Sequence, residues 1–220
     1  LPNGERIFTD EVSRIVPGKK GLDIGCGHGE FALQWSTVAK HIVGIDITSD
    51  FIKQGNQAGR QHVTFITANT KDRLPFEDGE FDCAYNRRGP TSAYLDVKRV
   101  LKKGGKLIGL HPGDASASEL SELFPSFFEP SSRGTPILDQ ITQRLHAGGL
   151  EHAEIETVRS VEYLHEPIDV IRVRLFGQKR SVWEAVMEQS MSGITRIFER
   201  NATDKGLPIT FERYIVRATI

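Results

Sequence analysis

A glycine-rich segment near the start of the chain has the composition of a ligand-binding turn. Residues 21–31 read GLDIGCGHGEF, in which Gly25, Gly27 and Gly29 follow the pattern GxGxG. Because glycine accepts positive φ and has no side chain, such a turn lets a ligand approach backbone N–H groups closely. Asp46 ends the next β-branched run, where a carboxylate can accept hydrogen bonds from ribose hydroxyls. A solvated strand-end carboxylate or helix N-cap is the alternative, and the turn beside it favours the ribose role.

A parallel sheet is needed to position these residues, and the first half of the chain has its pattern. Short β-branched runs alternate with helical patterns, as in βαβ units. The expected strands are residues 21–24, 41–46, 63–67, 81–85 and 106–111. The expected helices are residues 8–16, 30–38, 49–58 and 92–101, the last ended by Gly104-Gly105.

The second half of the chain is less regular. Residues 112–135 predict a long, partly helical loop, whose Phe124, Phe127 and Phe128 fit a substrate lid and core packing equally well. Helices are expected at 137–147 and 181–200, and strands around 155–159 and at 211–220. The apolar stripe around Trp183 favours core packing over a lid.

Composition limits the classes of protein to consider. The 220 residues carry a formal net charge of −1, which argues against a surface devoted to nucleic acid. Cys26 and Cys83 cannot form a disulfide framework, no metal-binding cluster is evident, and inert buried thiols are expected. There is no apolar run of membrane-spanning length and no signal-peptide pattern, so a cytoplasmic protein is expected. Since the chain begins at Leu1 and not at Met, residues are expected to precede it.

Four motifs between residues 20 and 112 carry a family resemblance. In order, they are LDIGCGHGEF, VGIDIT, LPFEDGEFDCAYNRRGP and RVLKKGGKLIGL. Together they resemble the class I methyltransferases that use S-adenosylmethionine, and among these the type 11 methyltransferases. Asp23, two places before the first glycine, and GxGxG in place of GxGxxG both oppose a nicotinamide-binding dehydrogenase.

The resemblance implies a fold and a domain organisation. The implied fold class is α/β: a Rossmann-like doubly wound sheet of seven strands, mostly parallel with the last antiparallel, and helices on both faces. Extra C-terminal helical or lid elements are expected. Residues 1–220 would form a single methyltransferase domain, with a cofactor-binding half at 1–112 and a substrate or lid half at 113–220.

The resemblance also implies contacts to S-adenosylmethionine. Asp23 would order the amino group of the methionine moiety, directly or through water. Asp46 would hold the ribose, and Ile47 would lie against the adenine face. The residues expected to line the methionine moiety are Gly25, Cys26 and Gly27.

Two positions depart from the family pattern. After the third strand the family has an acidic residue for the adenine amino group, whereas this chain has Ala68-Asn69-Thr70. Asn69 is assigned this contact, since an amide oxygen accepts the same hydrogen bond, and Thr70 is the competing choice. Asn86 would lie near the methyl group, but the sequence NRRGP that begins with it argues against an exocyclic-amine methylase of the adenine type.

Three residues near the expected methyl position are candidate substrate contacts. Arg87 and Arg88 could clamp an anionic substrate, although an ion pair with a carboxylate such as Asp114 or Asp78 is favoured. His111, at the end of the fifth expected strand, faces the crevice where open α/β sheets bind ligands. It could be a base or a substrate contact, or it could simply be packed and hydrogen-bonded.

The sequence therefore predicts a methyltransferase that acts on a small molecule. An RNA methyltransferase and a non-catalytic cofactor-binding subunit are the alternatives, and a homodimer is one expected assembly. No catalytic residue is assigned, because holding the nucleophile in line with an activated methyl group can supply most of the rate enhancement. A general base is needed only where the acceptor must lose a proton.

Overall fold

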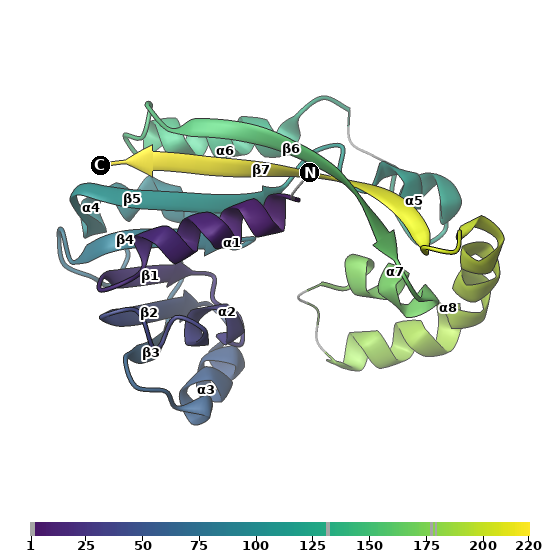
Figure 1. Ribbon diagram of the computed structural model, residues 1–220, viewed down its shortest axis with the longest axis horizontal. Coiled ribbons are helices and arrows are strands. Elements are labelled where there is room, and N and C mark those ends of the chain that lie inside the picture. The colour runs from purple at the N-terminus through teal and green to yellow at the C-terminus, as the bar shows by residue number, and fades with distance from the viewer. Residues whose placement is uncertain (1–2, 131–132, 177, 179) are drawn as a thin grey trace.

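A seven-stranded sheet forms the centre of the computed structural model (Figure 1). Its order is β3-β2-β1-β4-β5-β7-β6, with β1 to β5 parallel and β7 antiparallel to both of its neighbours. The predicted fold class is confirmed, including the antiparallel last strand. The strands are β1 (Lys20–Ile24), β2 (His41–Asp46), β3 (Val63–Thr67), β4 (Phe81–Arg87), β5 (Leu101–Pro112), β6 (Glu154–Leu164) and β7 (Leu207–Thr219).

The structure describes residues 3–130, 133–176, 178 and 180–220. Helices cover both faces of the sheet and form a separate group at one end (Figure 1). None of the helices in the described part of the chain is long and apolar enough to cross a membrane. They are α1 (Gly4–Ile15), α2 (Glu30–Leu33), α3 (Ser49–Ala58), the 3-10 helix η1 (Thr91–Leu95), α4 (Val97–Val100), α5 (Ser118–Leu123), α6 (Pro136–Ala147), α7 (Pro167–Arg174) and α8 (Arg180–Asn201).

Three apolar clusters hold these layers together. On one face of the sheet, α1 buries Phe8 and Val12, and α3 buries Ile52. On the other face, η1, α4 and α6 pack side chains such as Tyr94 and Ile141. The third cluster lies away from the centre of the sheet, where α5, α7 and α8 pack on the ends of β6 and β7. This third group of helices, with its own apolar centre, is called the lid below.

The helix predicted at 92–101 is present, but it is not continuous, and it ends one residue early because Leu101 begins β5. It breaks into η1 and α4, and the Gly104-Gly105 pair predicted to end it lies inside β5. Gly104 has a φ of +78° and donates its N–H to Ile220 O at 2.6 Å. Between its pairing with Phe81 and its pairing with Cys83, β5 shifts register, as at a β-bulge. Sheet pairing with distant strands therefore overrides the local glycine signal.

Other boundaries move for local reasons. α1 begins at Gly4 because Asn3 caps it, its side chain accepting a hydrogen bond from Arg6 N. The predicted helix 30–38 is α-helical only to Leu33. α7 was not predicted, although Pro167 at its start and the Glu166–Asp169 capping box are sequence signals for a helix N-terminus.

Candidate functional site

The glycine-rich turn is held against the end of β2 by its backbone. The N–H groups of Gly25 and Cys26 both donate to Ile45 O, at 2.8 and 2.9 Å. Gly25 has a φ of +72°, and a Cβ built there would lie 2.7 Å from the Cα of Gly89. Gly27 has a φ of +56°, but a Cβ there would meet no atom of the described residues within 4 Å. Packing therefore requires the first glycine, whereas the second faces open space.

Asp46 joins this turn to the end of β2. Its Oδ2 accepts a hydrogen bond from Gly27 N at 3.0 Å, and its Oδ1 accepts one from Thr48 N at 2.9 Å. Each carboxylate oxygen keeps a further lone pair, so two ligand hydroxyls can still donate to this group. The glycine-rich turn and Asp46, which the sequence analysis singled out, are thus in direct hydrogen-bond contact.

A cavity of about 240 Å³ opens beside the turn. Asp46, Ile47, Asn69 and Thr70 all line it, and Ile47 is 66% exposed although it is apolar. The Asn69 side-chain oxygen accepts from Lys71 N at 3.0 Å and keeps a second lone pair. The buried Thr70 hydroxyl is paired with the Ser92 hydroxyl at 2.7 Å; no other interaction of the Thr70 side chain is present in the described chain.

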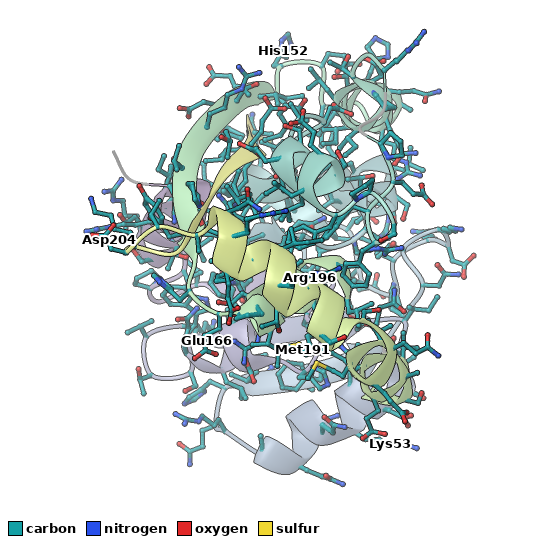
Figure 2. All side chains as sticks on the ribbon, turned by 90° about the vertical axis from the view of Figure 1, so that its right-hand side faces the viewer. Lys53, His152, Glu166, Met191, Arg196 and Asp204 are labelled. Carbon is teal, nitrogen blue, oxygen red and sulfur yellow. The ribbon has the colours of Figure 1, made fainter. Side chains whose placement is uncertain are left out.

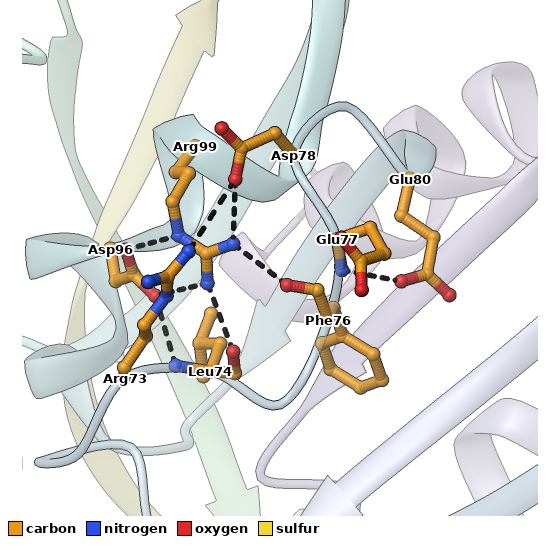
Figure 3. A network of polar contacts seen from close by, with 8 residues as sticks. All are labelled: Arg73, Leu74, Phe76, Glu77, Asp78, Glu80, Asp96 and Arg99. Carbon is orange, nitrogen blue, oxygen red and sulfur yellow. Dashed lines mark hydrogen bonds and ion pairs between the residues drawn. The ribbon is translucent and has the colours of Figure 1, made fainter.

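The loop that carries Asn69 and Thr70 is anchored at its far end by Arg99 (Figure 3). The guanidinium of Arg99 donates to Phe76 O at 2.7 Å and to Leu74 O at 2.9 Å. It also pairs with the carboxylate of Asp96 at 2.7 Å. It pairs with Asp78 at 3.0 Å as well, so Arg99 holds three groups of the chain between β3 and β4: two backbone carbonyls and one carboxylate.

Asp23 is the most unusual acid of the site. It is 2% exposed, and its Oδ2 has no hydrogen-bond partner among the residues that the structure describes. The hydroxyl of Tyr85, its register partner on β4, is also buried and has no other partner among the described residues; it interacts with the Asp23 carboxylate and so opposes the rise in the pKa of Asp23 that burial causes. Burial is the main reason that the pKa of Asp23 rises to about 7. A buried acid with a free oxygen beside a bare backbone turn suits the amino group of a bound methionine moiety.

The two cysteines are free and have little thiolate character. Burial, with help from the nearby Asp23 carboxylate, raises the pKa of the Cys26 thiol far above its usual range. The pKa of Cys83 rises to about 12, again chiefly through burial. Since the thiolate is the nucleophilic form, neither cysteine is suited to nucleophilic catalysis.

Asn86 does not line the cavity beside the glycine-rich turn, nor the second cavity that is described below. It lies inside β4, is fully buried, and uses both ends of its amide in the turn that follows. Its Oδ1 accepts from Gly89 N at 2.7 Å, and its Nδ2 donates to Pro90 O at 3.1 Å. The structure thus makes Asn86 a brace for the turn that packs on Gly25.

Arg87 and Arg88 share one carboxylate, which comes from the helix near the start of the chain. Glu5 of α1 accepts from Arg87 Nε at 3.1 Å and also pairs with Arg88. The expected ion pair is present, but the expected partners Asp114 and Asp78 were wrong. No sequence signal indicates that α1 reaches the end of β4, because the paired residues are more than eighty positions apart.

A second, larger cavity of about 790 Å³ lies at the carboxyl end of β5, between β7 and the lid. The turn at residues 88–90 borders both cavities, since Arg88 lines the larger one and Pro90 the smaller. Phe124 belongs to the lid core, whereas Phe128 lines the larger cavity. The apolar part of its wall includes Leu110, Phe128, Ile137, Val173, Phe176 and Phe211.

His111 lines the larger cavity and is 2% exposed. Its Nε2 lies 2.5 Å from the hydroxyl of Tyr94, and burial lowers its pKa to about 4, so the imidazole is neutral at pH 7. Nδ1 has no partner within the described chain. Sequence reasoning missed Tyr94: only the tertiary structure shows that a Cβ at Gly109 would lie 2.1 Å from its hydroxyl.

The lid also faces the glycine-rich turn across a third cavity, of about 860 Å³; below, the smaller and the larger cavity still mean those of 240 and 790 Å³. His28, exposed and 4.0 Å from the ring of Phe51, lies on the sheet side, and Trp183 and Met187 lie on the α8 side. Figure 2 shows α8 crossing the lid end of the molecule. Trp183 is half-buried against the lid core, so its stripe both packs and lines this space. Within the described ranges, no cluster of side chains could hold a metal ion.

Comparison with known proteins places this geometry in a family. Residues 22–109 match the model of the methyltransferase domain. An O-methyltransferase from Aspergillus nomiae is 31% identical, over 73% of this chain and 77% of its own length. A ubiquinone/menaquinone biosynthesis C-methyltransferase from Pseudomonas paraeruginosa is 32% identical over 54% of this chain; the chain spans about half (52%) of that relative's length. A geranyl diphosphate methyltransferase structure in complex with S-adenosylmethionine has a TM-score of 0.54 at 17% identity, covering 98% of this chain and 84% of its own.

Proposed function

Because this chain belongs to the class I S-adenosylmethionine-dependent methyltransferases, we propose that it transfers a methyl group from S-adenosylmethionine to a small molecule. One observation carries the proposal. Asp46, the glycine-rich turn and the unpartnered carboxylate oxygen of Asp23 gather at the carboxyl ends of adjacent parallel strands. This is the edge at which open α/β sheets bind ligands.

Residues of the smaller cavity and of the glycine-rich turn beside it then have roles in binding the cofactor. Asp46 accepts hydrogen bonds from the ribose hydroxyls, and Ile47 packs on the adenine ring. Asn69 accepts from the adenine amino group through its free lone pair, with Thr70 beside it. Asp23 holds the ammonium group of the methionine moiety, and the residues along that moiety are Gly25, Cys26 and Gly27.

The larger cavity holds the acceptor in this proposal. When bound, S-adenosylmethionine supplies a methyl group already activated by a sulfonium. The residues of the chain bind and orient the acceptor, and the lid excludes water from it. His111 offers a neutral imidazole, fixed by Tyr94, to a polar atom of the acceptor. Asn86 holds the turn between the two sites.

The volume of the larger cavity and the near-neutral net charge of the chain favour a small-molecule acceptor. We assign residues 1–112 to the cofactor and 113–220 to the acceptor and lid, within one domain, since β6 and β7 complete the sheet. A cytoplasmic location and a homodimer remain predictions.

Calorimetry with S-adenosylmethionine and S-adenosylhomocysteine tests the proposal. Both ligands are expected to bind, and Asp46→Asn is expected to weaken binding roughly tenfold by removing a charge-assisted hydrogen bond. Asp204→Asn, in an exposed turn of the lid, is the matched control and should bind like the native chain. Absence of both heat and a melting shift with either ligand would refute the cofactor assignment.

A further inference from the structure

The larger cavity carries charged side chains that cancel one another. Its described lining contains three arginines and three carboxylates. Arg213 pairs with Glu162 at 2.5 Å, and Arg172 pairs with Asp169 at 2.7 Å. These two arginines therefore already have their counter-charges within the protein.

The carboxylates of this cavity are also occupied or solvated. Asp114 accepts from the N–H groups of Ile137 and Leu138, at 2.8 and 3.1 Å, and from the Tyr214 hydroxyl at 2.8 Å. Glu129 is exposed, so water screens its charge. No acid of the described lining is therefore both buried and free to hold a cation.

Among the three arginines of this cavity, Arg88 has the partner that is most distant in sequence, Glu5 of α1. It stacks on the ring of Phe176 at 4.8 Å and pairs with Glu5, whose side chain is 19% exposed. Burial and the neighbouring Arg213 both lower the pKa of Arg88, while Glu162 opposes them. Arg88 nevertheless stays charged at pH 7. Glu5 also binds Arg87, whose side chain is 41% exposed, so one carboxylate is shared by Arg88 and a more solvated guanidinium.

We propose, building on the proposed function, that Glu5 sets the charge selectivity of the acceptor site, which admits neutral, ring-bearing molecules and rejects anionic ones. Phe128, Phe176 and Phe211 supply aromatic rings to the wall against which a flat ring packs, and Phe176 and Phe211 each carry an arginine over one face. A carboxylate brought into this cavity finds each arginine already paired. It loses hydration without gaining a counter-charge, which disfavours binding.

A pair of probes that differ by one carboxylate tests the proposal. Binding of 2-naphthol and of 6-hydroxy-2-naphthoate is measured by calorimetry at pH 7 with saturating S-adenosylhomocysteine. The native chain is expected to prefer 2-naphthol by roughly tenfold or more. Glu5→Gln keeps the shape of the side chain but frees Arg87 and Arg88, so binding of the naphthoate should improve by roughly fivefold or more while that of 2-naphthol stays unchanged.

Two further variants assign the effect to this ion pair. Glu151→Gln, exposed and at the opposite end of the sheet, should leave the preference unchanged. In Glu5→Gln/Arg88→Gln the gain for the naphthoate should largely disappear, since the freed cation is gone.

Three results would overturn the proposal: equal or tighter binding of the naphthoate by the native chain, an unchanged preference in Glu5→Gln, or binding of neither probe. S-adenosylhomocysteine binding is measured in the same experiment. If it binds while the probes behave otherwise than stated, the charge selectivity fails and the methyltransferase assignment stands.

Discussion

The two cavities on either side of the 88–90 turn treat charge in opposite ways. Close to the smaller one, two residues before Gly25 of its wall, lies the buried acid Asp23, whose Oδ2 accepts no hydrogen bond from a described residue. In the larger one, Arg88, Arg172 and Arg213 each have a carboxylate partner. The first arrangement costs the free protein stability and is repaid by a cationic ligand, whereas the second is complete without any ligand.

This difference separates the two binding tasks. A site with one unsatisfied acid discriminates strongly for a positive group, because only such a group restores the lost solvation. A site with paired charges selects by shape and by the polar atoms that remain, here His111 and the aromatic walls.

The largest expected effect comes from removing the unsatisfied charge with Asp23→Asn. Binding of S-adenosylmethionine at pH 8 should weaken by roughly ten- to a hundredfold, since a charge-assisted hydrogen bond is lost. Calorimetry at pH 6 and pH 8 provides a second readout. Native affinity should rise with pH as Asp23, whose pKa is about 7, ionises, and the variant should lose this dependence. A pH-independent native affinity would contradict the role of Asp23.

Asp23→Asn should also stabilise the free chain. Its folded-state pKa of about 7 lies above the ordinary value of 3.8, so between these pH values the unfolded chain binds fewer protons than the folded one. The free energy of unfolding therefore falls as pH rises from about 4 to about 7, by at most roughly 4 kcal/mol. Thermal melts of the native chain and the variant above pH 7 check this, and a lower melting temperature in Asp23→Asn would count against it.

A smaller effect, confined to the acceptor side, is expected for Tyr94→Phe. The change removes the hydroxyl that pairs with His111 Nε2 and leaves a buried nitrogen unsatisfied, which costs about 1–3 kcal/mol of stability. Denaturant unfolding measures the loss, and calorimetry with S-adenosylhomocysteine should give native affinity. Equal weakening of cofactor binding would mean that the two sites are not separate in the way their geometry implies.

The smallest effect is expected for Arg99→Met, which releases the loop between β3 and β4. Two hydrogen bonds to backbone carbonyls are lost, and the partly exposed ion pairs add little, so a loss of about 1–2 kcal/mol is expected. Affinity for S-adenosylmethionine should fall only a few-fold, because Asn69 and Thr70 become less ordered but remain present. An unchanged melting temperature would show that the anchor is dispensable.

Much of the first half could be predicted from the sequence because its signals are local. Strands 41–46 and 63–67 and helix 49–58 have the predicted bounds, since hydrophobic periodicity and turn residues set them. The helix predicted at 92–101 is present in two pieces, but the glycine stop after it was wrong because β5 begins at Leu101 and pairs with β4 and β7. α7 was missed because its short amphipathic pattern is weak, although its capping residues are present.

The sequence by itself determined the glycine-rich turn, the carboxylate at the end of β2 and the family. Glycines followed at this spacing by an acid are typical of a nucleotide-binding α/β sheet and of few other structures. Only the tertiary structure decided which charges are satisfied. It gave Arg88 its partner in Glu5, gave His111 its partner in Tyr94, and left Asp23 Oδ2 without a hydrogen-bond partner among the described residues. Charge compensation depends on which distant segments come within a few ångströms of one another, and that proximity is a property of the folded chain.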